Sequence, residues 1–170
     1  LLESLPVSDG LRLWGKYVGA VVATLLPLLI AYLALSAIVA FRLQDAGLLE
    51  AFVPVFLLEV LPGLLFVGAF SIGCPALIPV PLYAVLYIGY WFWGNLVAPS
   101  RVPTISCTPL TPIGKYAAIA FFGARGQGCD LTQHSLGTGG GVASIALLLA
   151  VGCLFLVVVQ LLRRWRLTRR

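Results

Sequence analysis

Four long apolar stretches constrain the fold of this chain more than any other feature of its sequence. They occupy residues 17–41, 51–72, 77–96 and 142–162, and Glu59 is the one charged residue within them. An α-helix needs about 18 or more apolar residues to cross a bilayer. The strands of a transmembrane barrel are shorter and alternate in polarity. We therefore predict an all-α, polytopic transmembrane bundle with four spanning helices in a single transmembrane domain, residues 1–170.

Charge supports a membrane protein rather than a nucleic-acid-binding one. Only 10% of the residues are charged and 61% are hydrophobic, whereas a soluble domain has about 25% charged residues. The net charge of +5 reflects five arginines in the segment 163–170. Basic residues gather on the cytoplasmic side of a membrane. We expect the lipid bilayer as a partner, and no nucleic acid.

The same charge pattern predicts the topology. The basic tail 163–170 is expected in the cytoplasm, and four spans place the start of the chain, residues 1–16, there too. The long loop 97–141 then lies outside. Within it, residues 115–123 are apolar but too few to span, so we predict an interfacial or re-entrant helix. The glycine-rich "LGTGGGVAS" that follows lacks the lysine of a phosphate-binding loop and is predicted to be a flexible loop entering the membrane.

The second span carries the most informative side chain, Glu59. An acidic group is costly at this depth, so it is expected to face a partner, a cavity or the bundle interior. A role in a substrate pathway, a proton relay or gating is one interpretation, and a packed, hydrogen-bonded carboxyl is the other. Pro54 and Pro62 on either side of it are predicted to kink the helix.

The cysteines suggest a disulfide and no metal site. Cys107 and Cys129 both fall in the loop assigned to the outside, where an oxidising environment favours a disulfide; two unpaired thiols are the alternative. Their spacing does not match a zinc site. We see no catalytic residues, no metal ligands and no cofactor site in this chain, and we expect it not to be an enzyme.

The opening segment precedes the first span directly. Pro6 interrupts the chain, and Ser8 or Asp9 is suited to cap a new helical turn. Trp14 and Tyr17 favour the interface, where the charge of Lys16 also reaches the headgroups. A short interfacial helix that bends into the span is therefore predicted.

The residues of this segment resemble a family. Glu3-Ser4-Leu5-Pro6-Val7-Ser8, followed by Leu13-Trp14-Gly15-Lys16 and a long apolar helix, is similar to the membrane subunits of ABC-2-type ATP-binding-cassette transporters. In that family such a segment lies between the second and third of six spans and contacts the ATPase. Residues 110–123, "LTPIGKYAAIAFFG", resemble the outer segment before the last span.

The resemblance implies that this chain is a permease subunit. It implies ATPase-coupling roles for a set of residues in the opening segment: Glu3, Leu5, Pro6, Ser8, Arg12, Gly15 and Lys16. ATP and Mg²⁺ would be held by a separate ATPase subunit, and a second permease copy or a paralogue would complete the pathway. It further implies export across a bacterial or archaeal plasma membrane.

The chain has no Met and begins with Leu, so we expect it to be a fragment, and the resemblance implies two further spans before Leu1. An accessory or assembly membrane protein without transport activity is the main alternative, and an intramembrane enzyme is a second one.

Overall fold

The chain is helical along almost the whole of its described length. The computed structural model describes residues 9–45, 47–97, 102–124 and 132–168, and these contain helices and turns but no strands. The elements are α1 (Asp9–Leu43), α2 (Gly47–Val55), the π-helical η2 (Phe56–Val60), α3 (Leu61–Gly73), the 3₁₀ turn η3 (Cys74–Ala76), α4 (Val80–Asn95), α5 (Lys115–Phe122) and α6 (Gln133–Thr168). The prediction of an all-α fold is confirmed.

Three helical stretches in the described residues are long and apolar enough to cross a membrane. They are Gly10–Leu43, Gly47–Ala76, which joins α2 to η3, and Gln133–Trp165. Only 6% of the most apolar part of the first stretch is buried. So much exposed apolar surface requires a hydrophobic environment, because its exposure to water is energetically unfavourable. The length and apolar surface of these helices therefore indicate an integral membrane protein.

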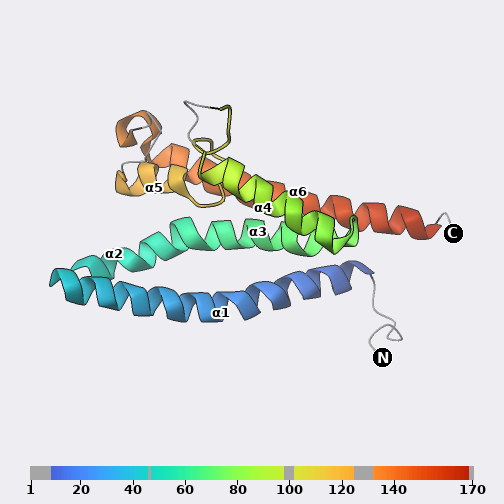
Figure 1. Ribbon diagram of the computed structural model, residues 1–170, viewed down its shortest axis with the longest axis horizontal. Coiled ribbons are helices and arrows are strands. Elements are labelled where there is room, and N and C mark those ends of the chain that lie inside the picture. The colour runs from blue at the N-terminus through green and yellow to red at the C-terminus, as the bar shows by residue number, and fades with distance from the viewer. Residues whose placement is uncertain (1–8, 46, 98–101, 125–131, 169–170) are drawn as a thin grey trace.

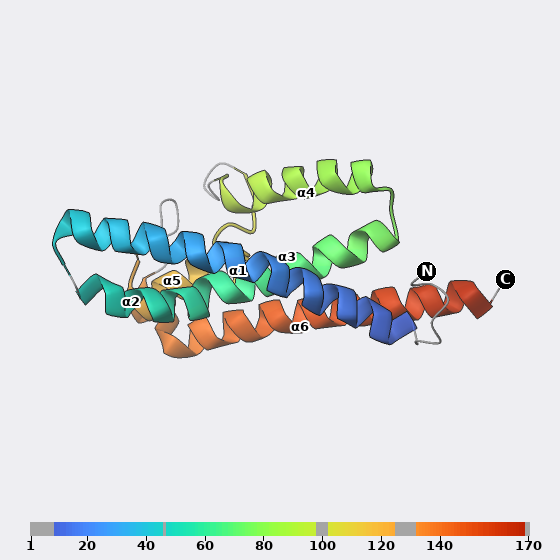
Figure 2. The ribbon, with the colours of Figure 1, turned by 90° about the horizontal axis from the view of Figure 1, so that it is seen from below.

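The predicted third span, 77–96, forms a shorter helix than expected. Helix α4 has 16 residues and is therefore about 24 Å long, whereas the bilayer core is about 30 Å thick. Its start is set by Pro79, which lies outside the helix in an extended conformation, and by Pro81 in the first turn. The chain turns back just before α4 (Figure 2), where the backbone N–H groups of Leu77 and Ile78 donate to the Cys74 carbonyl at the end of η3.

The long helices lie side by side, and the chain runs back and forth along them (Figure 1). Helix α3 packs against both α1 and α6, while α4 lies to one side of them (Figure 2). The start of α1 and the end of α6 share one end of the bundle. There, Gly10 is so close to the Gln160 side chain that a Cβ would collide with it.

Small residues let α3 and α6 approach closely. A Cβ added at Gly152 of α6 would lie 3.5 Å from the Ala69 methyl group of α3. Beside this contact, the rings of Phe70 and Phe155 stack with centroids 4.3 Å apart and planes 8° apart. Leu156 is almost fully buried. Close packing of this kind holds membrane helices together where the hydrophobic effect does not.

The interfacial bend predicted at the start of the chain is wrong for its described part. Helix α1 runs without interruption from Asp9 to Leu43, through Lys16, Tyr17 and Pro27. Nothing between Gly10 and Lys16 breaks a helix, and Leu13 is 3% exposed, so its packing fixes the first turns in line with the rest. The described part of the segment that resembles a coupling region, residues 9–16, is thus the start of one long helix.

The prediction of a flexible glycine loop is also wrong. Residues 138–144 lie within α6, which has a kink at Gly137 with φ 59°. A Cβ at Gly141 would lie 2.5 Å from the ring of Phe121 in α5, whereas one at Gly139 would meet nothing within 4 Å. The weak helix propensity of glycine is outweighed because its lack of a side chain lets α5 lie against α6.

Candidate functional site

The candidate site begins with a change of helix geometry around Glu59. Residues Phe56–Val60 form a π-helix between α2 and α3. The ring of Pro62 has no N–H and would clash with the carbonyl of Leu58 in a regular α-helix, so a wider turn relieves both problems. The kink predicted at the prolines therefore takes the form of a π-bulge. Bulges of this kind occur frequently at functional sites.

A loop before α5 closes over this bulge. Gly63 lies against the backbone oxygen of Pro112, and Gly114 lies against the Glu59 side chain, both too close for a Cβ. Gly114 also has φ 79°, which favours glycine. A Cβ at Gly114 would lie 3.3 Å from the Glu59 Cα. Two glycines therefore bring the loop onto the helix that carries the intramembrane carboxyl.

Short hydrogen bonds hold this loop in one shape. The Thr111 hydroxyl donates to the Ile105 carbonyl at 2.7 Å, and the Ser144 hydroxyl of α6 donates to the Pro109 carbonyl at 2.7 Å. The Lys115 ammonium donates to the Asn95 carbonyl at the end of α4, 2.8 Å away. A cation at a helix C-terminus is also favoured by the helix dipole. The loop thus ties α4, α5 and α6 together beside Glu59.

Glu59 lines a cavity of about 320 Å³. The cavity is open on one side and is lined by apolar and aromatic residues from α1, η2, α3, α4 and the loop, namely Leu28, Val60, Gly63, Leu64, Val67, Tyr87, Trp91, Pro112 and Ile113. Glu59 is the one carboxylic acid among the described lining residues, and its side chain is half-buried. Such a group accepts hydrogen bonds or pairs with a cation. Of the interpretations above, the structure favours a carboxyl that faces a cavity.

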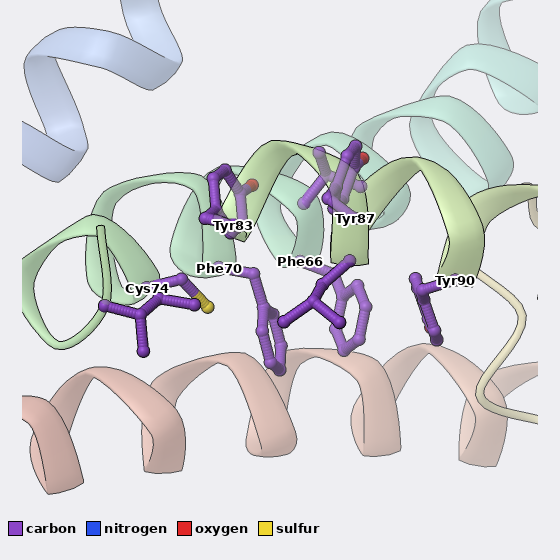
Figure 3. Close-up of a pocket in the computed structure, with 9 residues that line it drawn as sticks. Phe66, Phe70, Cys74, Tyr83, Tyr87 and Tyr90 are labelled. Carbon is purple, nitrogen blue, oxygen red and sulfur yellow. The ribbon is translucent and has the colours of Figure 1, made fainter. Parts of the chain in front are cut away.

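A second cavity, of about 230 Å³, lies between α3 and α4. Phe66 and Phe70 of α3 line it together with Tyr83, Tyr87 and Tyr90 of α4 (Figure 3). The hydroxyls of Tyr83 and Ser71 are hydrogen-bonded at 3.1 Å. The rest of the lining is formed by Val67, Cys74, Ile78 and Leu86. We call it the aromatic pocket; sequence reasoning missed it, although tyrosines three and four residues apart on one helix predict a common face.

The predicted coupling residues are placed only in part. Glu3, Leu5, Pro6 and Ser8 lie outside the described residues. Arg12, Gly15 and Lys16 are in the first two turns of α1, where Lys16 is exposed and a Cβ at Gly15 would meet nothing within 4 Å. These residues are distant in sequence from the Glu59 cavity and do not line it.

The predicted disulfide remains a prediction. Cys107 is half-buried in the loop before α5, whereas Cys129 lies outside the described residues. Cys74 and Cys153 carry free thiols. In the described part of the chain, no group of three or more His, Cys, Asp or Glu side chains is arranged to hold a metal ion.

Comparisons with known proteins give no assignment. No family model, no curated protein and no solved structure matches the chain. Its function is therefore a proposal built on its own residues and their geometry.

Proposed function

We propose that this chain is the membrane subunit of an ABC-2-type transporter, which forms a substrate pathway and is driven by a separate ATPase. The observation that carries the proposal is the course of α1, a single helix that leads from the segment resembling a coupling region to the neighbourhood of Glu59. Its first turns expose Lys16 at one end of the bundle. Its middle lines the Glu59 cavity through Leu28.

Two polar contacts along α1 support a mechanical link. The Tyr17 hydroxyl donates to the Leu65 carbonyl of α3 at 3.0 Å, and the Tyr32 hydroxyl donates to the Phe52 carbonyl of α2 at 3.0 Å. The Tyr32 ring also packs on Phe56, the first residue of the π-bulge, with centroids 5.1 Å apart. A movement imposed on the start of α1 would reach the helix that carries Glu59 through these contacts.

In this mechanism the partner supplies the chemistry. ATP binding closes the ATPase dimer, the start of α1 moves with it, and the bundle exchanges inward-facing and outward-facing arrangements. The start of α1 and the basic end of α6 are assigned to the cytoplasm. Helix α4 is assigned as a fourth membrane-spanning helix, and because it is short the bilayer is locally thinner around it. Helix α5 is assigned as an interfacial or re-entrant helix on the outer side. A second copy or a paralogue completes the pathway against the exposed side of α1.

Crosslinking tests the coupling assignment directly. A photoreactive amino acid at Ser8 or Arg12 is expected to crosslink to an ATPase subunit that copurifies with the chain. The control position is Phe41, which is 75% exposed near the other end of α1 and is expected to give no such product. Absence of a crosslink from both test positions in a complex that hydrolyses ATP contradicts the coupling role.

A further inference from the structure

The Glu59 cavity and the aromatic pocket adjoin each other. Val67 of α3 and Tyr87 of α4 line both of them. One cavity offers a carboxyl group, and the other offers rings and aliphatic side chains with almost no polar surface. Together they form a binding surface that is polar at one end and apolar at the other.

The aromatic pocket has the dimensions and lining for a hydrocarbon chain rather than for a whole compact molecule. Its volume, about 230 Å³, is smaller than the roughly 300–1,000 Å³ typical of pockets for drug-sized ligands. The rings of Phe66, Phe70 and Tyr83 are among its lining residues (Figure 3). A polar group placed among them would lose its hydration without gaining hydrogen-bond partners.

The Glu59 cavity favours a cation. A carboxylate that faces an apolar cavity is stabilised by a bound positive charge, and among the described lining residues none is basic. Lys115 directly follows Gly114, but its ammonium donates to the Asn95 carbonyl at 2.8 Å. The rings of Tyr87 and Trp91 also line the cavity, and aromatic faces attract cations.

We propose that the two cavities together bind a single-chain amphiphile with an ammonium headgroup, with the headgroup at Glu59 and the hydrocarbon chain in the aromatic pocket. This inference deepens the proposed function, on which it rests, by naming the class of substrate. Glu59 contributes charge recognition, while Phe70 and its neighbours contribute the apolar contact. Tyr87, which lines both cavities, lies where headgroup and chain join.

Binding of radiolabelled dodecyltrimethylammonium to the purified chain in phosphatidylcholine nanodiscs tests this. We expect saturable binding above that of empty nanodiscs. Glu59→Gln is expected to weaken it about tenfold or more, a change of about 1.4 kcal/mol or more, and Phe70→Ala is expected to weaken it as well. Uncharged dodecanol is expected to compete equally well for wild type and Glu59→Gln. Gly89→Ala, at a site where a Cβ meets nothing within 4 Å, serves as the control variant.

The outcomes separate the possible sources of such a ligand. Competition by lysophosphatidylethanolamine as strong as that of unlabelled dodecyltrimethylammonium indicates a membrane lipid, and weaker competition indicates a small hydrophobic amine; both support the shared chemistry. No saturable binding to wild type overturns the inference. So does equal binding by wild type and Glu59→Gln, if circular dichroism shows that both are folded.

A negative result in the binding experiment and a negative result in the crosslinking experiment have different consequences. Dodecyltrimethylammonium binding requires no ATPase, so loss of the crosslinks from Ser8 and Arg12 would leave the binding site in place and remove only the transport role. Conversely, crosslinks without binding would keep the coupled membrane subunit and refute the substrate class.

Discussion

Replacement of Gly63 by alanine tests whether the loop before α5 is fitted to the π-bulge. In the interior of a helix, alanine is normally more stable than glycine by about 0.5–1 kcal/mol. At Gly63, however, the new methyl group would collide with the backbone oxygen of Pro112. A backbone atom does not move aside as the tip of a flexible side chain does, and hydrogen bonds from Thr111 to the Ile105 carbonyl and from Ser144 to the Pro109 carbonyl anchor the loop just before Pro112.

The size of the effect follows from these opposing contributions. Overpacking by a methyl group typically costs about 1–3 kcal/mol, which exceeds the gain in helix propensity. We therefore expect Gly63→Ala to lower the free energy of unfolding by about 0.5–2 kcal/mol. The matched control is Gly89→Ala in α4, where a Cβ would meet nothing within 4 Å. It is expected to be neutral or to raise the free energy of unfolding by up to about 1 kcal/mol.

Both variants are compared by titrating the protein from mild detergent into sodium dodecyl sulfate while circular dichroism records helix content. The difference between the two variants is the informative quantity, because it removes the intrinsic propensity of alanine. Equal midpoints for Gly63→Ala and Gly89→Ala would show that the loop does not rest on the π-bulge, and the geometry of the Glu59 cavity would then be refuted.

Three further predictions concern the packing and covalent structure of the loop region. Gly141→Ala is expected to be destabilising by about 1–3 kcal/mol because its methyl group would meet a phenyl ring, whereas Gly139→Ala at an open position is not; unfolding midpoints distinguish them, and equal values count against the α5–α6 contact. Lys115→Met is expected to lower the free energy of unfolding by about 1–3 kcal/mol, because the Asn95 carbonyl at the end of α4 loses a charged hydrogen-bond donor; an unchanged unfolding midpoint contradicts this. Mass spectrometry without reduction is expected to show a peptide pair linked through Cys107 and Cys129, and two alkylated thiols would exclude the disulfide.

The sequence predicts the helical class and the intramembrane carboxyl well, because both depend on local properties. Long apolar runs identify α1, the α2–η3 stretch and α6 by length alone. Glu59 is identified because a charge within such a run has an obvious energetic cost. Neither conclusion requires knowledge of which helices are neighbours.

What depends on neighbours is predicted poorly. The glycine run that ends at Gly141 resembles a loop because glycine disfavours helices. The reason for glycine at this position becomes clear only when Phe121 of α5 is seen to lie against Gly141, where a side chain would collide with the ring. The aromatic pocket is missed for the same reason, since Phe70 and Tyr87 line one pocket only when α4 folds back along α3. The end of α4 is likewise set from a distance, by Lys115.

The π-bulge has a consequence for how the second long helix presents its faces. One additional residue in a turn rotates everything beyond it by about 100° relative to a regular α-helix. The apolar stripes of α2 and α3 are therefore out of phase: Phe52 packs on the Tyr32 ring of α1, whereas Phe70 stacks on Phe155 of α6 and lines the aromatic pocket with Phe66. Deleting one residue from Phe56–Val60 would leave a continuous helix and yet break one of these two alignments. The π-bulge thus rotates the faces of this long helix relative to each other, so that its first part packs on α1 while its second part lines the aromatic pocket.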